Sequence, residues 1–130
     1  MFRTLPMMAF VIIAYNIIVY LTGLSMDGQV TTVTLISGAI WSISVGDIIV
    51  FFGLLLLFLE LVGSTQTGAS TIINHALSML VLLVALVQFI VLPEFGTSTF
   101  FALVMLALFD VVAGFTVTIT AARRDFTVGE

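Results

Sequence analysis

Asp110 is the residue of this sequence whose chemistry stands out most, because it lies inside the apolar run FFALVMLALFDVVAGFTV. An ionisable group in membrane hydrocarbon costs roughly 2.5–3.5 kcal/mol on insertion scales, so its presence points to a function by default. At about 1.5 Å of rise per residue, Asp110 lies near the middle of the predicted span, at the depth of Asn16 in the first apolar run. We expect an Asp110–Asn16 contact, which is either a proton or cation site or a hydrogen bond between packed helices.

Glu60 and His75 form the second candidate pair. They flank the short segment GSTQTGA, so two antiparallel helices would bring them to similar depth, with Ser78 three residues after His75 on the same helix face. Such a pair exchanges protons near neutral pH, or the histidine ligates a metal, a haem or a pigment. One His and no Cys is a poor ligand set, because zinc sites use three or four ligands. We therefore predict no metal or cofactor, keep His75 as the candidate cofactor ligand, and retain a structural hydrogen-bonded pair as the alternative.

No residue set predicts catalysis. The sequence has no cysteine, no HExxH zinc motif, no phosphate-binding glycine loop and no plausible Ser/His/Asp set. Two features instead predict contacts. Gly114, Thr118 and Ala122 form a row of small residues that lets another helix approach closely, and Trp41 is typical of a membrane interface. Gln88, in the third apolar run, is a weaker candidate for a bridge between helices.

The composition predicts a membrane protein. The 130 residues are 62% hydrophobic and 8% charged, whereas soluble domains are roughly half apolar and a quarter charged. A chain of this size cannot hide so much apolar surface inside itself, so the lipid bilayer must be its solvent. The three basic residues, all arginine, and the net charge of -4 argue against binding to nucleic acid.

Four segments are apolar enough to be membrane spans, since about twenty such residues cross a bilayer. Their approximate bounds are 5–24, 47–62, 70–92 and 98–122. We therefore expect an all-α membrane protein, a four-transmembrane-helix bundle that forms one domain over residues 1–130.

Three arginines set the expected orientation. Arg3 precedes the first span, and Arg123 and Arg124 follow the fourth. An even number of spans places all three on one side of the membrane, and the positive-inside rule makes that side cytoplasmic. We therefore expect both termini in the cytoplasm and the segments 25–46 and 93–97 on the outer side.

The segment 30–46 interrupts the apolar runs with many threonines and serines. Apolar residues around Trp41 alternate with serines, and those around Val33 alternate with threonines, which is the pattern of strands. Ser37-Gly38 suits a tight turn between the two arms. We expect a short β-hairpin at the outer interface, with Trp41 at headgroup level and the apolar face resting on the helix ends. An ordinary ordered loop is the alternative.

A resemblance to a known family covers most of the chain from Ser37 to Phe126. The sequence is similar to small uncharacterised four-span inner-membrane proteins of Gram-negative bacteria in the runs SGAIWSISVGD, LLLLFLELV, NHALSMLV and FFALVMLALFDVVAGFTVTITAARRDF. The resemblance implies the topology and a location in the bacterial inner membrane. It implies no activity and no site.

Three functions remain open from the sequence. Small size, the missing catalytic set, the small-residue row and the hairpin favour a non-catalytic accessory or scaffolding subunit of a larger inner-membrane complex. Its partners would be other membrane subunits or copies of itself.

The alternative is a small homo-oligomeric proton or cation transporter or channel that uses Asp110 with Glu60 and His75. Four short spans rarely enclose a pathway, so this pathway would lie between copies. A haem- or pigment-binding subunit is the third possibility.

Overall fold

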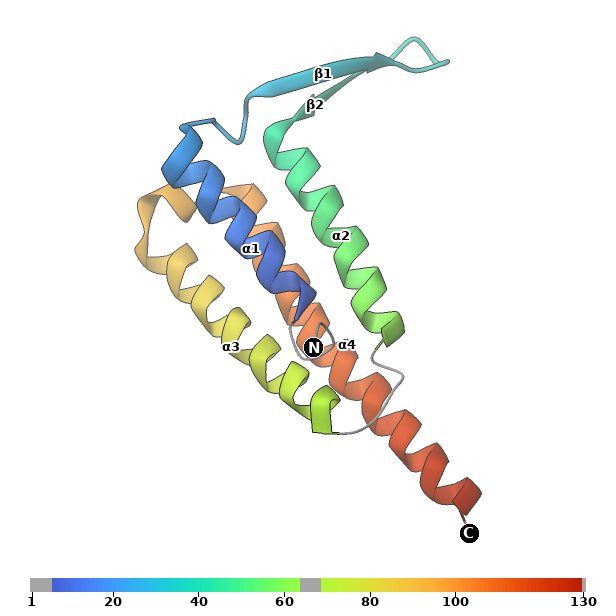
Figure 1. The fold of residues 1–130 in the computed structure, drawn as a ribbon. Coiled ribbons are helices and arrows are strands. Elements are labelled where there is room, and N and C mark those ends of the chain that lie inside the picture. The colour runs from blue at the N-terminus through green and yellow to red at the C-terminus, as the bar shows by residue number, and fades with distance from the viewer. Residues whose placement is uncertain (1–5, 64–68, 130) are drawn as a thin grey trace.

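The computed structural model describes residues 6–63 and 69–129. Within these ranges it leaves out the side chains of residues 63, 69–71, 117–118, 121–122 and 124–129. Arg3 and most of the predicted loop at 63–69 therefore lie outside the described part of the chain. Over the described residues the protein is mostly helical, with four main helices and one two-stranded hairpin (Figure 1).

The first helix has two parts. The α-helix α1 spans Met7–Ile17, and the π-helix η2 continues it over Ile18–Thr22. Gly23 ends this helix with a φ of 69°, a left-handed conformation that glycine adopts without steric cost. The helix therefore stops close to the predicted position, although its last turn is wider than an α-helix.

The predicted β-hairpin is confirmed. Strand β1 spans Gln29–Thr34 and pairs antiparallel with β2, which spans Ile40–Ser44. Val33 lies opposite Trp41 in this register. The turn contains the expected Ser37-Gly38 step, and Gly38 has a φ of 90°. The backbone N–H of Gly38 donates to the carbonyl of Leu35 at 2.9 Å, which closes the turn.

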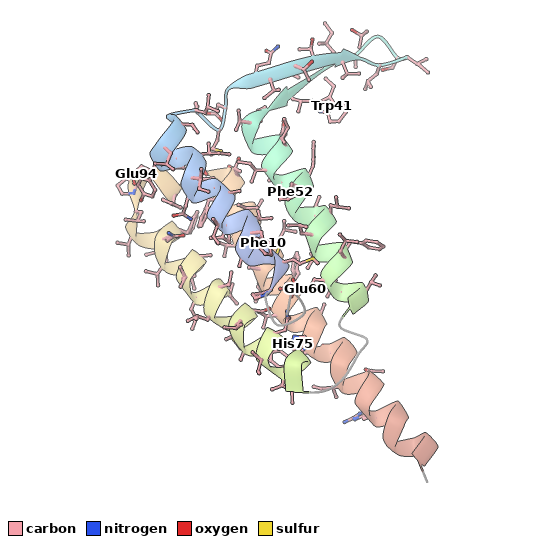
Figure 2. All side chains as sticks on the ribbon, viewed as in Figure 1. Phe10, Trp41, Phe52, Glu60, His75 and Glu94 are labelled. Atoms are coloured by element: carbon pink, nitrogen blue, oxygen red, sulfur yellow. The ribbon has the colours of Figure 1, made fainter. Side chains whose placement is uncertain are left out.

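The hairpin does not rest on the helix ends as expected. It extends sideways from the first turn of α2, and most of it lies clear of the bundle (Figure 1). Every residue of β1 is exposed, and Ile36 at the tip is exposed as fully as in an extended peptide. Trp41 alone of the hairpin makes a ring contact with a helix, at 6.2 Å between its ring centroid and that of Phe51, among the described residues. Figure 2 shows Trp41 on the side of the hairpin that faces α2.

Helix α2, which spans Val45–Gly63, follows β2 without a loop. Ser44 and Asp47 make this direct junction possible because they cap the helix reciprocally. The Asp47 N–H donates to Ser44 Oγ at 3.1 Å, and the Ser44 N–H donates to Asp47 Oδ2 at 3.0 Å. The helix consequently begins two residues before the predicted start at 47.

The other two helices are joined by a short turn. Helix α3 spans Ala69–Val91, the 3-10 turn η3 spans Pro93–Phe95, and α4 spans Ser98–Gly129. Thr97 caps α4, because its Oγ1 accepts a hydrogen bond from the Phe100 N–H at 3.1 Å. The expected end of α4 at residue 122 is wrong, since the helix continues through Arg123 and projects past the rest of the bundle (Figure 1). Charged residues leave the apolar layer there, but nothing in their chemistry stops a helix.

Helix α4 is the centre of the bundle. It packs against α2 and α3, while α1 lies against α2, α3 and α4. Most of the fully buried apolar side chains come from α1 and from the first half of α4, among them Val11, Tyr15, Phe100 and Leu103, each at 0% exposure. Most other large apolar side chains face outward, as lipid contact requires.

Three of the described helices are long and apolar enough to cross a membrane. The qualifying segments are Val45–Val62, Ile72–Val91 and Ser98–Thr116. Met7–Thr22 is an apolar helix of shorter length. The fold and composition thus define the class of this molecule as a helical membrane protein. We call the end of the bundle that carries β1 and β2 the hairpin end, and the end at which α2 finishes and α3 begins the loop end.

Candidate functional site

The first turn of α1 is capped by a side chain from another helix. Pro6 precedes α1 and provides no capping side chain, so the first backbone N–H groups of the helix need acceptors from elsewhere. Glu60, near the loop end of α2, supplies one. The Met7 N–H donates to Glu60 Oε2 at 2.7 Å, and the Met8 N–H also interacts with this carboxyl. A carboxylate is favoured at a helix N-terminus because the helix dipole is positive there.

Asp110 of α4 lies beside Glu60 rather than alone in the middle of the bundle. The two carboxyls are close enough to interact electrostatically, and Ser78 of α3 interacts with both. Asn74, one turn before Ser78, also interacts with Glu60. Four helices therefore meet at this point: α1 with its N-terminus, α2 and α4 with one carboxyl each, and α3 with an amide and a hydroxyl.

This cluster is almost sealed from its surroundings. Glu60 is 9% exposed and Asp110 is 3% exposed. One oxygen of each carboxyl, Glu60 Oε1 and Asp110 Oδ2, is buried without a hydrogen bond. Two like charges about 4 Å apart repel by about 4 kcal/mol at an effective dielectric of about 20. Two ionised carboxyls in this setting therefore need a compensating positive charge.

His75 lies at the same end of the bundle as Glu60, as the sequence predicted (Figure 2). Its imidazole packs against α4, with a centroid distance of 4.7 Å to the ring of Phe115. A methyl group built on Gly114 would lie 3.0 Å from His75 Cε1, so the absence of a side chain at Gly114 makes room for the imidazole. This tight packing leaves little space for a haem or pigment on that side of the ring. The described residues contain no group of three or more His, Cys, Asp or Glu side chains placed to hold a metal ion.

The expected Asp110–Asn16 contact is wrong. Asn16 pairs instead with Gln88 of α3, and each amide donates to the other. Gln88 Nε2 donates to Asn16 Oδ1 at 2.9 Å, and Asn16 Nδ2 donates to Gln88 Oε1 at 3.4 Å. Gln88 was the weaker candidate in the sequence, yet it supplies the partner. The physical reason is depth, because Asn16 lies in the half of the bundle near the hairpin end, whereas Asp110 lies at the level of Glu60.

A second polar group ties the hairpin end together. The Tyr15 hydroxyl donates to the Glu94 carbonyl at 3.3 Å and hydrogen-bonds Thr97 Oγ1 at 2.8 Å. The ring of Tyr15 packs on those of Phe95 and Phe100, with centroid distances of 5.2 and 4.7 Å. Beside this cluster lies an open hollow of about 510 Å³, whose lining residues include Asp27 and Glu94. This hollow is a weaker candidate site than the carboxyl pair, because it is open and its tyrosine is already hydrogen-bonded within the bundle.

The remaining predicted contact residues fall in different places. Gly114 lies where α4 meets α3, and Trp41 lies between the hairpin and α2. Thr118 belongs to α4, but its side chain is outside the described residues. Of the predicted small-residue row, the structure therefore describes the surroundings of Gly114 alone, and Gly114 packs against α3 of the same chain.

No family model, curated protein or solved structure matches this chain. The resemblance to four-span inner-membrane proteins therefore stays a prediction.

Proposed function

We propose that this protein is a non-catalytic accessory or scaffolding subunit of a larger assembly in a bacterial inner membrane. In this proposal α1 is a fourth span beside the three longer helices, both chain ends are cytoplasmic, and the hairpin lies on the outer side. The exposed Arg123, beyond the apolar part of α4, agrees with a cytoplasmic loop end under the positive-inside rule.

The unsupported hairpin is the observation that carries the proposal. An isolated two-stranded hairpin is marginally stable in water. Here most of its apolar side chains face outward, including Ile36 at the tip and Ile40 at 71% exposure. Among the described residues of the hairpin, only Trp41 makes a ring contact with a helix. Such a ribbon gains stability and buries its apolar groups when the outer surface of another subunit covers it.

The test is purification of the tagged full-length protein from its native membranes in mild detergent, followed by mass spectrometry. We expect a stoichiometric partner of known function. The variant Ile36→Ser/Ile40→Ser should lose this partner, because it removes the exposed apolar groups of the hairpin. The matched control Ser37→Ala/Ser42→Ala changes neighbouring positions of the same hairpin and should retain it. Recovery of the protein alone, or equal recovery of the partner with both variants, would contradict the proposal.

A small homo-oligomeric proton or cation transporter is the second candidate, favoured by the buried carboxyls of Glu60 and Asp110. A pathway through a single copy is opposed by the apolar core between this pair and the hairpin end, where Val11, Phe100 and Leu103 are all 0% exposed. The pathway would therefore run between copies. Proton flux into liposomes that contain the purified oligomer, lost in Asp110→Asn, would favour this function over the first.

A further inference from the structure

Oxygen atoms from three helices converge at Ser78. Its side chain interacts with the carboxyl of Glu60 from α2 and with the carboxyl of Asp110 from α4. The hydroxyl has one hydrogen, and it donates this hydrogen to the Asn74 carbonyl at 3.0 Å. One hydrogen cannot be donated to the Asn74 carbonyl and to both carboxyls at the same time, so Ser78 alone leaves the carboxyl oxygens short of donors.

The hydrogen bonds around the two carboxyls are unequally distributed. Glu60 receives the N–H groups at the start of α1 and interacts with Asn74. For Asp110 the interacting partners are Ser78 and the like charge of Glu60. Yet Glu60 Oε1 and Asp110 Oδ2 both remain buried with no hydrogen bond. An ionised oxygen that is buried without a hydrogen bond is strongly unfavourable. The two carboxyls therefore lack one positive charge that would neutralise this oxygen.

We propose that Glu60, Asp110 and Ser78 form a binding site for one exchangeable small monovalent cation, H⁺ or Na⁺. The cation lies between the two unpartnered carboxyl oxygens and leaves the pair with a single negative charge. The α1 N-terminus holds that charge on Glu60. Either cation satisfies the chemistry, because H⁺ bridges two carboxyl oxygens and Na⁺ accepts carboxylate and hydroxyl oxygens as ligands.

The elements around the site restrict how the cation enters. Among the described residues that interact at the site, α2 contributes Glu60 and α4 contributes Asp110 as titratable groups, while α1 contributes backbone N–H groups. The nearby titratable group of α3, His75, packs against Gly114 and Phe115 of α4. The buried apolar core blocks the route from the hairpin end. His75 lies one turn closer to the loop end than Ser78, so we expect exchange from the loop end. This site is independent of the proposed accessory role, since a subunit with or without partners can contain it.

Infrared spectroscopy of the full-length protein in lipid vesicles tests the site, because the carbonyl stretch of a protonated carboxyl is distinct from the bands of a carboxylate. Spectra are compared at neutral pH in choline chloride and in sodium chloride of equal concentration, in water and in deuterium oxide. In choline chloride we expect one protonated carboxyl that shifts in deuterium oxide. The band should be lost in Asp110→Asn, because the remaining Glu60 is satisfied by the α1 N-terminus. It should persist in Glu94→Gln, which changes an exposed carboxyl at the hairpin end.

The sodium spectra distinguish the two occupants. A band that is equal in both salts identifies the cation as H⁺, and a band that disappears in sodium chloride identifies it as Na⁺ replacing the proton. Absence of a protonated carboxyl in choline chloride overturns the proposal, because choline is too large to enter the site. A band that survives unchanged in Asp110→Asn also overturns it. The wild-type spectra decide the first of these outcomes even when the variant fails to fold. The result does not depend on whether a partner subunit is found.

Discussion

The reciprocal amide pair of Asn16 and Gln88 allows a sharp test of how α1 is held against α3. Asn16 uses both of its N–H groups, one donating to the Ile12 carbonyl of its own helix at 2.8 Å and one to Gln88 at 3.4 Å. Its oxygen accepts the shorter bond from Gln88 at 2.9 Å. Replacing either residue by leucine removes both hydrogen bonds between the two amides and leaves the other amide without its partner. Asn16→Leu also removes the bond to the Ile12 carbonyl.

The expected magnitude follows from these bonds. Side-chain hydrogen bonds between membrane helices average about 0.6 kcal/mol and reach about 1.7 kcal/mol. One short bond and one at the distance limit therefore predict a coupling energy of about 1 kcal/mol. Each single change, Asn16→Leu or Gln88→Leu, should cost about 1–3 kcal/mol, because a half-buried amide is left unpaired. The double variant should cost less than the sum, because leucine at both positions leaves no unpaired group.

The assay is a double-mutant cycle on reversible unfolding of the full-length protein in mixed micelles, by titration with a denaturing detergent. A second cycle combines Asn16→Leu with Thr116→Val, whose hydroxyl donates to the Val112 carbonyl within α4, far from the pair. That control cycle should be additive within about 0.5 kcal/mol. If the Asn16–Gln88 cycle is equally additive, the two amides do not interact in the folded protein, and our account of the α1–α3 contact is wrong.

Two further substitutions test the hairpin end. Gly46→Ala should destabilise the protein by about 1–3 kcal/mol and lower its unfolding midpoint, because the new methyl group collides with the side chain of Thr99. The control Gly96→Ala should change this midpoint little, because a methyl group there has only ordinary contacts. Tyr15→Phe should cost about 0.5–1.5 kcal/mol through loss of the hydroxyl bond to Thr97, and thermal unfolding that leaves the midpoint unchanged would show that this bond contributes nothing.

The local patterns of the sequence predicted the local structure well. The alternation around Val33 and Trp41 produced paired strands in which these two residues lie opposite each other, and Gly38 supplies the positive φ of the turn. The same patterns could not predict where the hairpin lies. Its orientation depends on the way β2 enters α2 at Ser44, a reciprocal cap that joins strand and helix without a loop. A capping sequence marks where a helix begins, but not the direction from which the chain arrives.

The misplaced partner of Asp110 has a different cause. Counting residues inward from the ends of each apolar run treats all runs as centred in one plane. Counting from the hairpin end gives a better answer, because α2 and α4 both begin there. At about 1.5 Å per residue, Glu60 and Asp110 lie roughly 22 and 18 Å below the starts of their helices. Helix starts are marked by caps in the sequence, at Ser44 and at Thr97, so this proximity was within reach of sequence reasoning.

The capping of α1 by Glu60 was the feature least accessible from the sequence, because a backbone N–H has no side-chain signature. One signal was nevertheless present. Pro6 stands directly before the helix, where a capping serine, threonine, aspartate or asparagine is usual, so the N–H groups of Met7 and Met8 required an acceptor from elsewhere. In hydrocarbon water cannot supply it, so another helix must provide the acceptor, and a carboxylate suits the positive end of the helix dipole. Glu60 is the acidic residue of α2 nearest the loop end, and its position is explained by this demand whether or not the cluster also binds a cation. The variant Glu60→Gln therefore separates helix capping from cation binding. It keeps an oxygen acceptor for the Met7 N–H and removes the second carboxyl charge beside Asp110.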